Sequence, residues 1–254
     1  MLPPIRGFIE SSLIEWEGMV CSVVILQGCN LCCPFCHSHH LISREMPREV
    51  VPLEDVLNFL HNRKGWTDGV VVSGGEPTVH PELPEFLAAF KSRGLAVKLD
   101  TNGTAPGMLT DLLDMGLVDY VAMDLKAPLV PERYTPACGG RVEVAAVQSS
   151  VKLLLRHKVD YEFRTTVCPA FVTLADLPEM ANAIRGARRY ILQQFVPETA
   201  LGSETRSVQA YPKEALLEAA ASLQGVVQRC YVRGEEGYQP PVPAGMAGAG
   251  SRHN

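Results

Sequence analysis

The segment VCSVVILQGCNLCCPFCHSHH, residues 20–40, joins a short apolar run to a loop with four cysteines within eight positions. Residues 20–26 are almost continuously aliphatic, which predicts a strand buried on both faces, as in parallel sheets. The tight group of cysteines predicts a metal centre, because such groups in a reducing compartment bind metal more often than they form disulfides. The loop directly follows the strand, at the end where barrel folds carry their chemistry.

Apolar runs of the same kind recur along the chain, each ending in glycine, aspartate, asparagine or proline. They predict further strands at residues 69–73, 96–100, 119–124, 161–167 and 190–196. Amphipathic segments predict helices within residues 52–65, 81–94, 108–116, 147–158 and 211–224. The alternation of strands and helices implies a parallel sheet with right-handed crossovers.

The number of strand–helix units selects the fold class. About six units are visible, fewer than the eight of a closed barrel. We therefore predict an α/β fold in the form of an incomplete (β/α)6 TIM-like barrel of parallel strands. A doubly wound, Rossmann-like sheet is the alternative, but no G-x-G-x-x-G follows the first strand.

Length and composition bound the class of protein. The chain has 254 residues and a net charge of -5, which suits one large domain and gives no overall basic surface for nucleic acid. We predict one domain over residues 1–238 and a disordered tail, rich in proline, glycine and alanine, over residues 239–254. The first residues lack a signal-peptide pattern, and the apolar runs are too short to cross a bilayer. We expect a cytoplasmic protein without a membrane partner.

The cysteine loop offers two nested ligand sets. One is Cys29, Cys33 and Cys36, and the other replaces Cys33 by Cys32. Neighbouring side chains diverge, so three thiolates are the expected number. An ordinary [4Fe-4S] cluster and structural zinc take four protein ligands, whereas three thiolates leave one iron of a [4Fe-4S] cluster open for a substrate. A zinc site completed by His37 is the alternative.

The remaining cysteines and histidines carry weaker signals. We expect His37 to pack beside the metal centre, and His39 and His40 to be exposed loop residues. Cys21 alternates with core residues and is predicted to be a small buried hydrophobe. Three further cysteines lie too far apart in the sequence to predict a second cluster: Cys138, Cys168 and Cys230.

Polar motifs follow the next predicted strands. In SGGEPT, residues 73–78, Gly74 and Gly75 allow close approach of a ligand to the backbone, and the Glu76 carboxylate follows. A Gly-Gly turn after a strand also has a purely structural explanation. In LDTNG, residues 99–103, Asp100 either orients a ligand or caps the next turn.

Charged residues follow the fourth strand and lie within the fifth. In MDLKAP, residues 123–128, Asp124 and Lys126 alternate along an extended segment, so both side chains are able to face one cavity. A surface ion pair is the structural alternative. In EFRTTV, residues 162–167, Arg164 lies in a buried strand and needs an anionic partner, which a structural salt bridge would also supply.

The Cys-x3-Cys-x2-Cys loop after a first strand, followed by Gly-Gly-Glu, resembles the radical S-adenosylmethionine (SAM) enzymes. The resemblance selects Cys29, Cys33 and Cys36 as cluster ligands. It implies that the open iron binds the amino and carboxylate groups of SAM, which the reduced cluster cleaves to methionine and a 5'-deoxyadenosyl radical. It also implies that Gly74, Gly75 and Glu76 receive the methionine amino group.

Within this family the chain resembles the short glycyl-radical-enzyme activases, especially those of anaerobic ribonucleoside-triphosphate reductase. The resemblance runs from about residue 5 to residue 196 and includes LQGCNLCCPFCHS, VVSGGEPT, VKLDTNGTAP, VDYVAMDLKAP and YEFRTTV. It implies that Lys126 and Arg164 neutralise the SAM carboxylate. It further implies that Asp100 and Asp124 lie nearby and share a monovalent cation.

The activase resemblance also implies partners. The expected partner is a glycyl radical enzyme, namely anaerobic ribonucleoside-triphosphate reductase, and the expected electron donor is a flavodoxin or ferredoxin. Two departures weaken the partner assignment more than the chemistry. EWEG, residues 15–18, replaces an Asp-aromatic-Pro-Gly turn, and Ser38 replaces an asparagine in the cluster loop.

Two other functions compete with an activase. The first is a radical SAM enzyme that modifies a small molecule, a peptide or tRNA, although the acidic composition disfavours tRNA because phosphate contacts need Lys and Arg. The second is a non-catalytic metal-binding module, which would hold zinc or an iron-sulfur cluster without any turnover of SAM.

Overall fold

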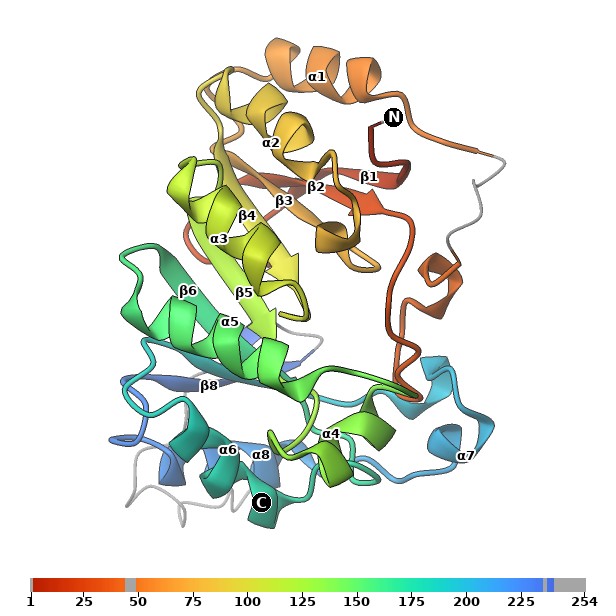
Figure 1. Ribbon diagram of the computed structural model, residues 1–254, viewed down its shortest axis with the longest axis vertical. Coiled ribbons are helices and arrows are strands. Elements are labelled where there is room, and N and C mark those ends of the chain that lie inside the picture. Colours follow the sequence, from red (N-terminus) through yellow and green to blue (C-terminus); the bar gives the residue numbers. More distant parts are fainter. Residues whose placement is uncertain (1, 44–48, 235–236, 240–254) are drawn as a thin grey trace, which may run out of the picture.

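A single curved sheet organises the computed structural model, which describes residues 2–43, 49–234 and 237–239 (Figure 1). The described residues form nine strands, each hydrogen-bonded to its neighbours in chain order. Seven central strands are parallel: β2 (Cys21–Leu26), β3 (Gly69–Gly74), β4 (Ala96–Thr101), β5 (Tyr120–Asp124), β6 (Asp160–Thr166), β7 (Tyr190–Gln193) and β8 (Cys230–Gly234). Antiparallel strands β1 (Ile5–Ser12) and β9 (Gly237–Gln239) form the two edges.

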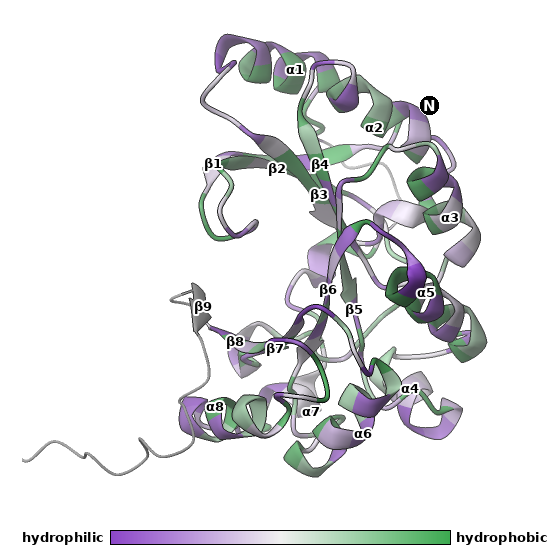
Figure 2. Ribbon diagram, turned by 90° about the vertical axis from the view of Figure 1, so that its left-hand side faces the viewer, coloured by the Kyte–Doolittle hydropathy of each residue, from purple (hydrophilic) through white to green (hydrophobic). Residues whose placement is uncertain are grey.

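The predicted incomplete parallel barrel is confirmed. The six predicted strands are β2 to β7, and six helix-containing crossovers connect the seven parallel strands. No pairing between the edge strands β1 and β9 is present among the described residues, so the sheet stays open there (Figure 2). The sequence did not predict β1, β8 or β9, because these strands lack the continuous apolar runs of the buried ones; in β1, for example, only Ile5 is buried.

Helices cover the convex face of the sheet (Figure 2). Five correspond to predicted helices: α1 (Leu53–Asn62), α2 (Leu83–Lys91), α3 (Pro106–Asp114), α5 (Val144–Arg156) and α8 (Lys213–Ser222). The short helices α4 (Pro131–Ala137), α6 (Leu177–Ala183) and α7 (Ser203–Arg206) were not predicted. Proline at the first turn is compatible with a helix, since the missing N–H has no intrahelical partner there, so Pro131 and Pro178 are tolerated.

The two faces of the sheet bury different cores. On the helix side, Phe86 and Phe90 of α2 are completely buried and pack edge to face at 5.3 Å between ring centroids. On the opposite face, the loop between β1 and β2 turns inward and buries Trp16 against Tyr120, with 5.7 Å between ring centroids. Because successive side chains of a strand alternate between faces, Val71 joins this inner core while its neighbours join the outer one.

A charged network fills the inner face beneath this loop. The Lys98 ammonium, only 1% exposed, donates to the backbone carbonyl of Glu15 at 2.5 Å and lies 3.5 Å from the Glu162 carboxylate. The Tyr120 hydroxyl donates to the same carboxylate at 2.9 Å. These contacts compensate the burial of charge, which would otherwise be costly.

Two sequence predictions concern the ends and the environment of the chain. The tail predicted to be disordered, residues 239–254, lies outside the described residues except for Gln239, which ends β9. In the part of the chain that the structure describes, no helix is long and apolar enough to span a membrane.

Truncation of the α2 core should destabilise the fold. We expect Phe86→Ala to lower the free energy of unfolding by about 3–5 kcal/mol, because it leaves a cavity between α2 and the sheet. Urea unfolding monitored by circular dichroism measures the change. Trp66→Ala is the matched control, since Trp66 is 78% exposed and should change stability by less than about 0.5 kcal/mol. Equal effects of the two substitutions would contradict the packing described here.

Candidate active site

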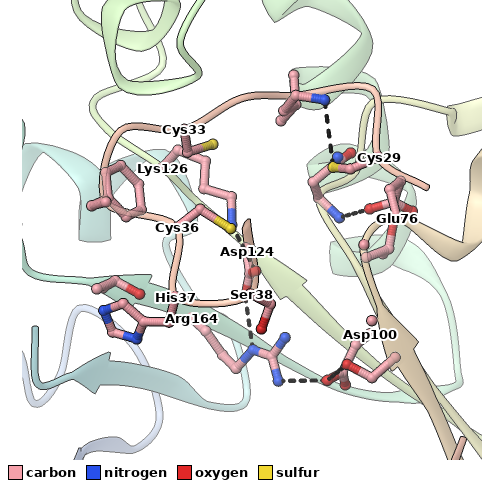
Figure 3. Close-up of a pocket in the computed structure, with 18 residues that line it drawn as sticks. Cys29, Cys33, Cys36, His37, Ser38, Glu76, Asp100, Asp124, Lys126 and Arg164 are labelled. Atoms are coloured by element: carbon pink, nitrogen blue, oxygen red, sulfur yellow. Dashed lines mark hydrogen bonds and ion pairs between the residues drawn. The ribbon is translucent and has the colours of Figure 1, made fainter. Parts of the chain in front are cut away.

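One cavity lies at the carboxyl ends of strands β2 to β6, and the cysteine loop forms one wall of it (Figure 3). Parallel strands end at one rim of the sheet, so residues far apart in the sequence meet there. All predicted site residues line this cavity: Cys29, Cys33, Cys36, Gly74, Gly75, Glu76, Asp100, Asp124, Lys126 and Arg164.

Backbone hydrogen bonds hold the cysteine loop in place. Its start is fixed where Gly28 N–H donates to the Leu41 carbonyl at 2.7 Å, and its end where Leu201 N–H donates to the Cys36 carbonyl at 3.1 Å. Cys29, Cys33 and Cys36 face the cavity, whereas Cys32 is exposed and does not line it. The structure therefore brings together the first of the two nested ligand sets.

Burial disfavours the thiolate form of all three cavity cysteines, but their pKa values differ. Burial raises the pKa of Cys29 to about 11 and also raises the pKa of Cys36. At Cys33 the effect of the neighbouring Cys138 thiol outweighs that of burial, and the pKa of Cys33 is lowered to about 7. Neutral thiols are thus favoured at two positions until a cation stabilises the thiolates, as iron does in a cluster.

The donor set fits a [4Fe-4S] cluster. Three soft sulfur ligands line one cavity, and the buried apolar side chains of Leu31 and Phe35 line the same wall. Among the described residues, no three histidine, cysteine, aspartate or glutamate side chains converge on the position of a single metal ion. His37 lines the cavity rim and stacks on Phe195 with 6.0 Å between ring centroids.

The Gly-Gly-Glu turn packs directly against the cysteine loop. Gly75 N–H donates to the Leu26 carbonyl at 3.0 Å, and Glu76 N–H donates to the Gly28 carbonyl at 2.8 Å. A Cβ atom on Gly75 would lie 2.1 Å from the Gly28 carbonyl oxygen, so the close approach requires glycine at this position. The two motifs therefore form one rigid corner of the cavity.

Glu76 is buried at the base of this corner and binds the protein itself. Its Oε1 accepts from Thr78 N–H at 3.1 Å and from the hydroxyls of Thr78 and Thr101 at 2.6 and 2.8 Å. Its Oε2 accepts from Asn102 N–H at 2.6 Å. Burial raises the pKa of this carboxyl, although the hydrogen bonds oppose the rise. Oε2 retains capacity for a further donor, because a carboxylate oxygen accepts about two hydrogen bonds.

Paired charges form the wall opposite the corner. The Arg164 guanidinium bridges two carboxylates, with Nη1 at 3.1 Å from Asp100 Oδ2 and Nε at 2.8 Å from Asp124 Oδ1. Lys126 Nζ lies 2.8 Å from Asp124 Oδ2, and Ser73 donates to Asp100 at 2.9 Å. The guanidinium thus lies between the carboxylates predicted to share a monovalent cation, and that cation stays a prediction.

The pairing shifts the protonation of these groups. Burial opposes ionisation of Asp124, but Arg164 and Lys126 outweigh it and lower its pKa to about 2. Burial also opposes the charge on Lys126, yet the Asp124 carboxylate raises the Lys126 pKa. Asp100 Oδ1 is buried without a hydrogen-bond donor, which marks one unsatisfied acceptor in the cavity wall.

Sequence reasoning missed the supporting residues behind the site. The Cys138 carbonyl, at the end of α4, accepts from Cys32 N–H at 3.1 Å, and the Tyr134 hydroxyl accepts from Lys126 N–H at 3.4 Å. Asn102 donates to Asn30 at 2.9 Å and so connects the cysteine loop to the end of β4. No spacing in the sequence signals these contacts, because they arise from tertiary docking.

The site and fold agree with one protein family. A family model described as the radical SAM superfamily matches residues 23–184, and the chain belongs to this superfamily of enzymes. Its cofactors are a [4Fe-4S] cluster and SAM, which the three cavity thiols and the adjoining polar wall fit.

Individual relatives span several activities. A Methanocaldococcus jannaschii protein provisionally named a glycyl-radical enzyme activating enzyme is 29% identical over 214 residues, which cover 83% of this chain and 87% of that protein. The pyruvate formate-lyase-activating enzyme of Clostridium pasteurianum is 33% identical over 46% of this chain and 50% of its own. The 7-carboxy-7-deazaguanine synthase of Aquifex aeolicus is 36% identical over 36% of this chain and 42% of its own.

Solved structures support the fold alone. Streptococcus suis SuiB bound to S-adenosylmethionine matches with a TM-score of 0.62 and 16% identity, over 82% of this chain and 51% of that chain. TYW1 with a lysine-pyruvate adduct matches with a TM-score of 0.55 and 16% identity, over 85% and 76% of the two chains.

Removal of the Asp124 charge should destabilise the rim in a pH-dependent way. We expect Asp124→Asn to lower the free energy of unfolding by roughly 2–4 kcal/mol at neutral pH, because Lys126 and Arg164 lose a shared counter-ion. This range lies between the values for surface and for fully buried ion pairs. The Asp124 pKa is about 2 in the folded protein against 3.8 ordinarily, so its contribution is complete above pH 4 and is lost as pH falls through 2.

Urea unfolding of both proteins from pH 6 down to pH 2.5 measures this difference. It should stay constant above pH 4 and shrink below it. Asp160→Asn is the control, because Asp160 pairs with Arg188 at an exposed position. A difference that is independent of pH down to 2.5 would contradict the assigned pairing.

Proposed function

We propose that the chain is a radical SAM activase that generates a glycyl radical on a partner enzyme. The observation that carries this proposal is the meeting of three thiols, the Gly-Gly-Glu corner and the paired-charge wall in one cavity. The relative provisionally named as an activating enzyme supports the same assignment, because its similarity extends over 83% of this chain.

Cys29, Cys33 and Cys36 are proposed to hold the cluster, and Cys32 is the spare cysteine. With SAM bound and an electron supplied, the cluster provides the chemistry that yields a 5'-deoxyadenosyl radical. The role of this chain is then to orient SAM and to exclude water. The corner that fixes Glu76 against Gly28 would hold the methionine portion of SAM at a constant distance from the thiols.

SAM would find complementary contacts on the Gly-Gly-Glu corner and on the paired-charge wall of Asp100, Asp124, Lys126 and Arg164. Gly74, Gly75 and Glu76 are proposed to receive the methionine amino group, and the remaining acceptor capacity of Glu76 Oε2 supports this role. Asp100 Oδ1 is a second acceptor, buried without a hydrogen-bond donor from the described residues. Lys126 and Arg164 are proposed to face the methionine carboxylate. Both are already paired, so the carboxylate would join an existing network rather than meet an isolated cation.

A second chamber adjoins the cofactor cavity on the open side of the sheet. Glu15, Gln193 and Arg233 line it, and it shares Arg164 with the cofactor cavity. Glu15 pairs with Arg233 at 2.7 Å, so this chamber presents paired charges and amide groups. Such a surface suits a neutral peptide segment with many hydrogen-bonding groups. Access from the open side of the sheet suits a loop of a partner protein.

We propose anaerobic ribonucleoside-triphosphate reductase as the glycyl radical partner and a flavodoxin or ferredoxin as the electron donor. The resemblance of the rim motifs to the activases of that reductase supports the first proposal. The similarity to 7-carboxy-7-deazaguanine synthases favours a second candidate, a radical SAM enzyme acting on a small molecule. That match covers only 36% of this chain, whereas the match to the activating enzyme covers 83%.

Production of 5'-deoxyadenosine tests the radical chemistry. Anaerobically reconstituted protein, reduced with dithionite and given SAM, should release 5'-deoxyadenosine, quantified by chromatography. We expect Cys33→Ala to lower the yield at least a hundredfold, because a cluster ligand is lost. Cys32→Ala is the matched control and should retain most of the yield, since Cys32 is exposed outside the cavity. Equal losses in both variants, or a cluster-loaded protein without any product, would refute the assignment.

The partner is tested separately by electron paramagnetic resonance. Addition of an anaerobic ribonucleotide reductase large subunit should give a glycyl radical doublet that depends on SAM and on Cys33. Formation of 5'-deoxyadenosine without a glycyl radical would keep the radical SAM chemistry and reject this partner.

A further inference from the structure

Gln193 ends strand β7 at the rim of the second chamber. Tyr190 and Leu192 of the same strand belong to the helix-side core, so the alternation of side chains along a strand turns Gln193 to the inner face. In register, Gln193 pairs with Thr166 of β6 and with Arg233 of β8. Thr166 lines the cofactor cavity and Arg233 lines the second chamber, so Gln193 lies on the row of residues that connects the two.

The half-buried Gln193 side chain lines the chamber, and its amide has no hydrogen-bond partner among the described residues. The charged groups around it are engaged with one another: Arg164 with Asp100 and Asp124, and Glu15 with Arg233. A glutamine amide offers two N–H donors and a carbonyl acceptor. The chamber therefore presents a neutral group that donates and accepts at once, and a peptide group is its natural complement because it also carries one N–H and one C=O.

The surroundings of Gln193 are fixed. Arg233 Nη2 lies 2.7 Å from Glu15 Oε2 and so forms part of the chamber wall. The next residue, Gln194, donates its backbone N–H to the Arg233 carbonyl at 3.0 Å and its side-chain Nε2–H to the Tyr211 carbonyl at 2.9 Å. These contacts hold the backbone and the side chains beside Gln193, whereas its own amide remains available to a ligand.

The row on which Gln193 lies has a length that suits an extended peptide. Neighbouring strands lie about 4.8 Å apart, so the row from Thr166 through Gln193 to Arg233 spans about 10 Å. An extended chain advances about 3.3 Å per residue, so about three residues cover this distance. A chain that places one residue at the cofactor cavity beside Thr166 therefore carries a neighbouring peptide group past Gln193.

We propose that Gln193 binds a main-chain peptide group of the partner's glycine-bearing loop and so places the glycine beside the cofactor cavity. The Gln193 amide donates to a peptide carbonyl of that loop and accepts from a peptide N–H. Recognition through main-chain groups suits a segment around glycine, because glycine has no side chain to bind. The inference rests on the proposed function of the chain as an activase of a protein substrate.

The rate of glycyl radical formation at several partner concentrations tests this role. Reconstituted protein is reduced, given SAM and mixed with an anaerobic ribonucleotide reductase large subunit, and electron paramagnetic resonance follows the radical. Gln193→Met keeps a side chain of similar length without an amide. We expect it to lower kcat/KM for the large subunit by about five- to thirtyfold, mainly through a higher KM, because two hydrogen bonds are lost. Gln193→Asn keeps a shortened amide and should lose less.

Gln228→Met is the matched control and should leave kcat/KM unchanged, because Gln228 is exposed and precedes β8 at the opposite end of the strands. Iron content and SAM binding, measured by equilibrium dialysis, should be the same in all variants, since Gln193 does not line the cofactor cavity. A loss confined to kcat/KM, smaller in Gln193→Asn and absent from the control, supports the inference. An unchanged kcat/KM in Gln193→Met, or equal losses in Gln193→Met and Gln193→Asn, overturns it. A parallel fall in iron content or SAM binding also overturns it, because Gln193 would then support the cofactor site itself.

Failure of the proposed function shows in the unsubstituted protein. If that protein yields no 5'-deoxyadenosine with SAM, the radical SAM activity is rejected. If it yields 5'-deoxyadenosine but no glycyl radical on the large subunit, the partner and the role of Gln193 are rejected together, while the radical SAM chemistry stands. If the glycyl radical forms and its rate does not respond to Gln193→Met, only the role of Gln193 is rejected.

Discussion

The site depends on the close backbone contact between the cysteine loop and the Gly-Gly-Glu turn. Parallel strands β2 and β3 end side by side, with Leu26 opposite Gly74, so the segments that follow them meet at once. Gly75 and Glu76 then donate to the Leu26 and Gly28 carbonyls, an approach that any Cβ on Gly75 would prevent. This contact fixes the backbone of the cysteine loop against that of Glu76, and the Thr78 and Thr101 hydroxyls then hold the Glu76 carboxylate.

The second constraint is the burial of charge at the rim. Arg164 and Lys126 would be costly to bury alone, and each has a carboxylate partner within 3.1 Å. The partners belong to β4 and β5, so adjacent strands of the sheet supply the compensation. The network leaves Asp100 Oδ1 unsatisfied, and an unsatisfied buried acceptor is costly unless a ligand provides the donor. An incoming cationic or N–H group would satisfy this acceptor.

The sequence predicts the central strands well, because strands buried on both faces form continuous apolar runs. It does not predict β1 or β8, whose partial exposure breaks that pattern, or α4, whose two prolines argue against a helix. The spacing of the cysteines and the rim motifs indicates which residues gather at the cavity. It does not indicate that Glu76 already accepts four hydrogen bonds from the protein, because three of its donor groups come from Thr101, Asn102 and the backbone of Thr78.

In a closed barrel further strands would cover the inner face of the sheet. In this open sheet the loop between β1 and β2 covers part of that face. The loop inserts Trp16 into the inner face and gives its Glu15 carbonyl to Lys98. The Glu15 side chain then pairs with Arg233 of β8, so a residue next to one edge of the sheet binds a residue next to the other. A closed barrel would achieve the same connection with strands, but it would also close the side of the chamber that adjoins Arg164. An ion pair between side chains connects the two edges and leaves the chamber beside Arg164 open on this side, which is compatible with the proposed protein substrate.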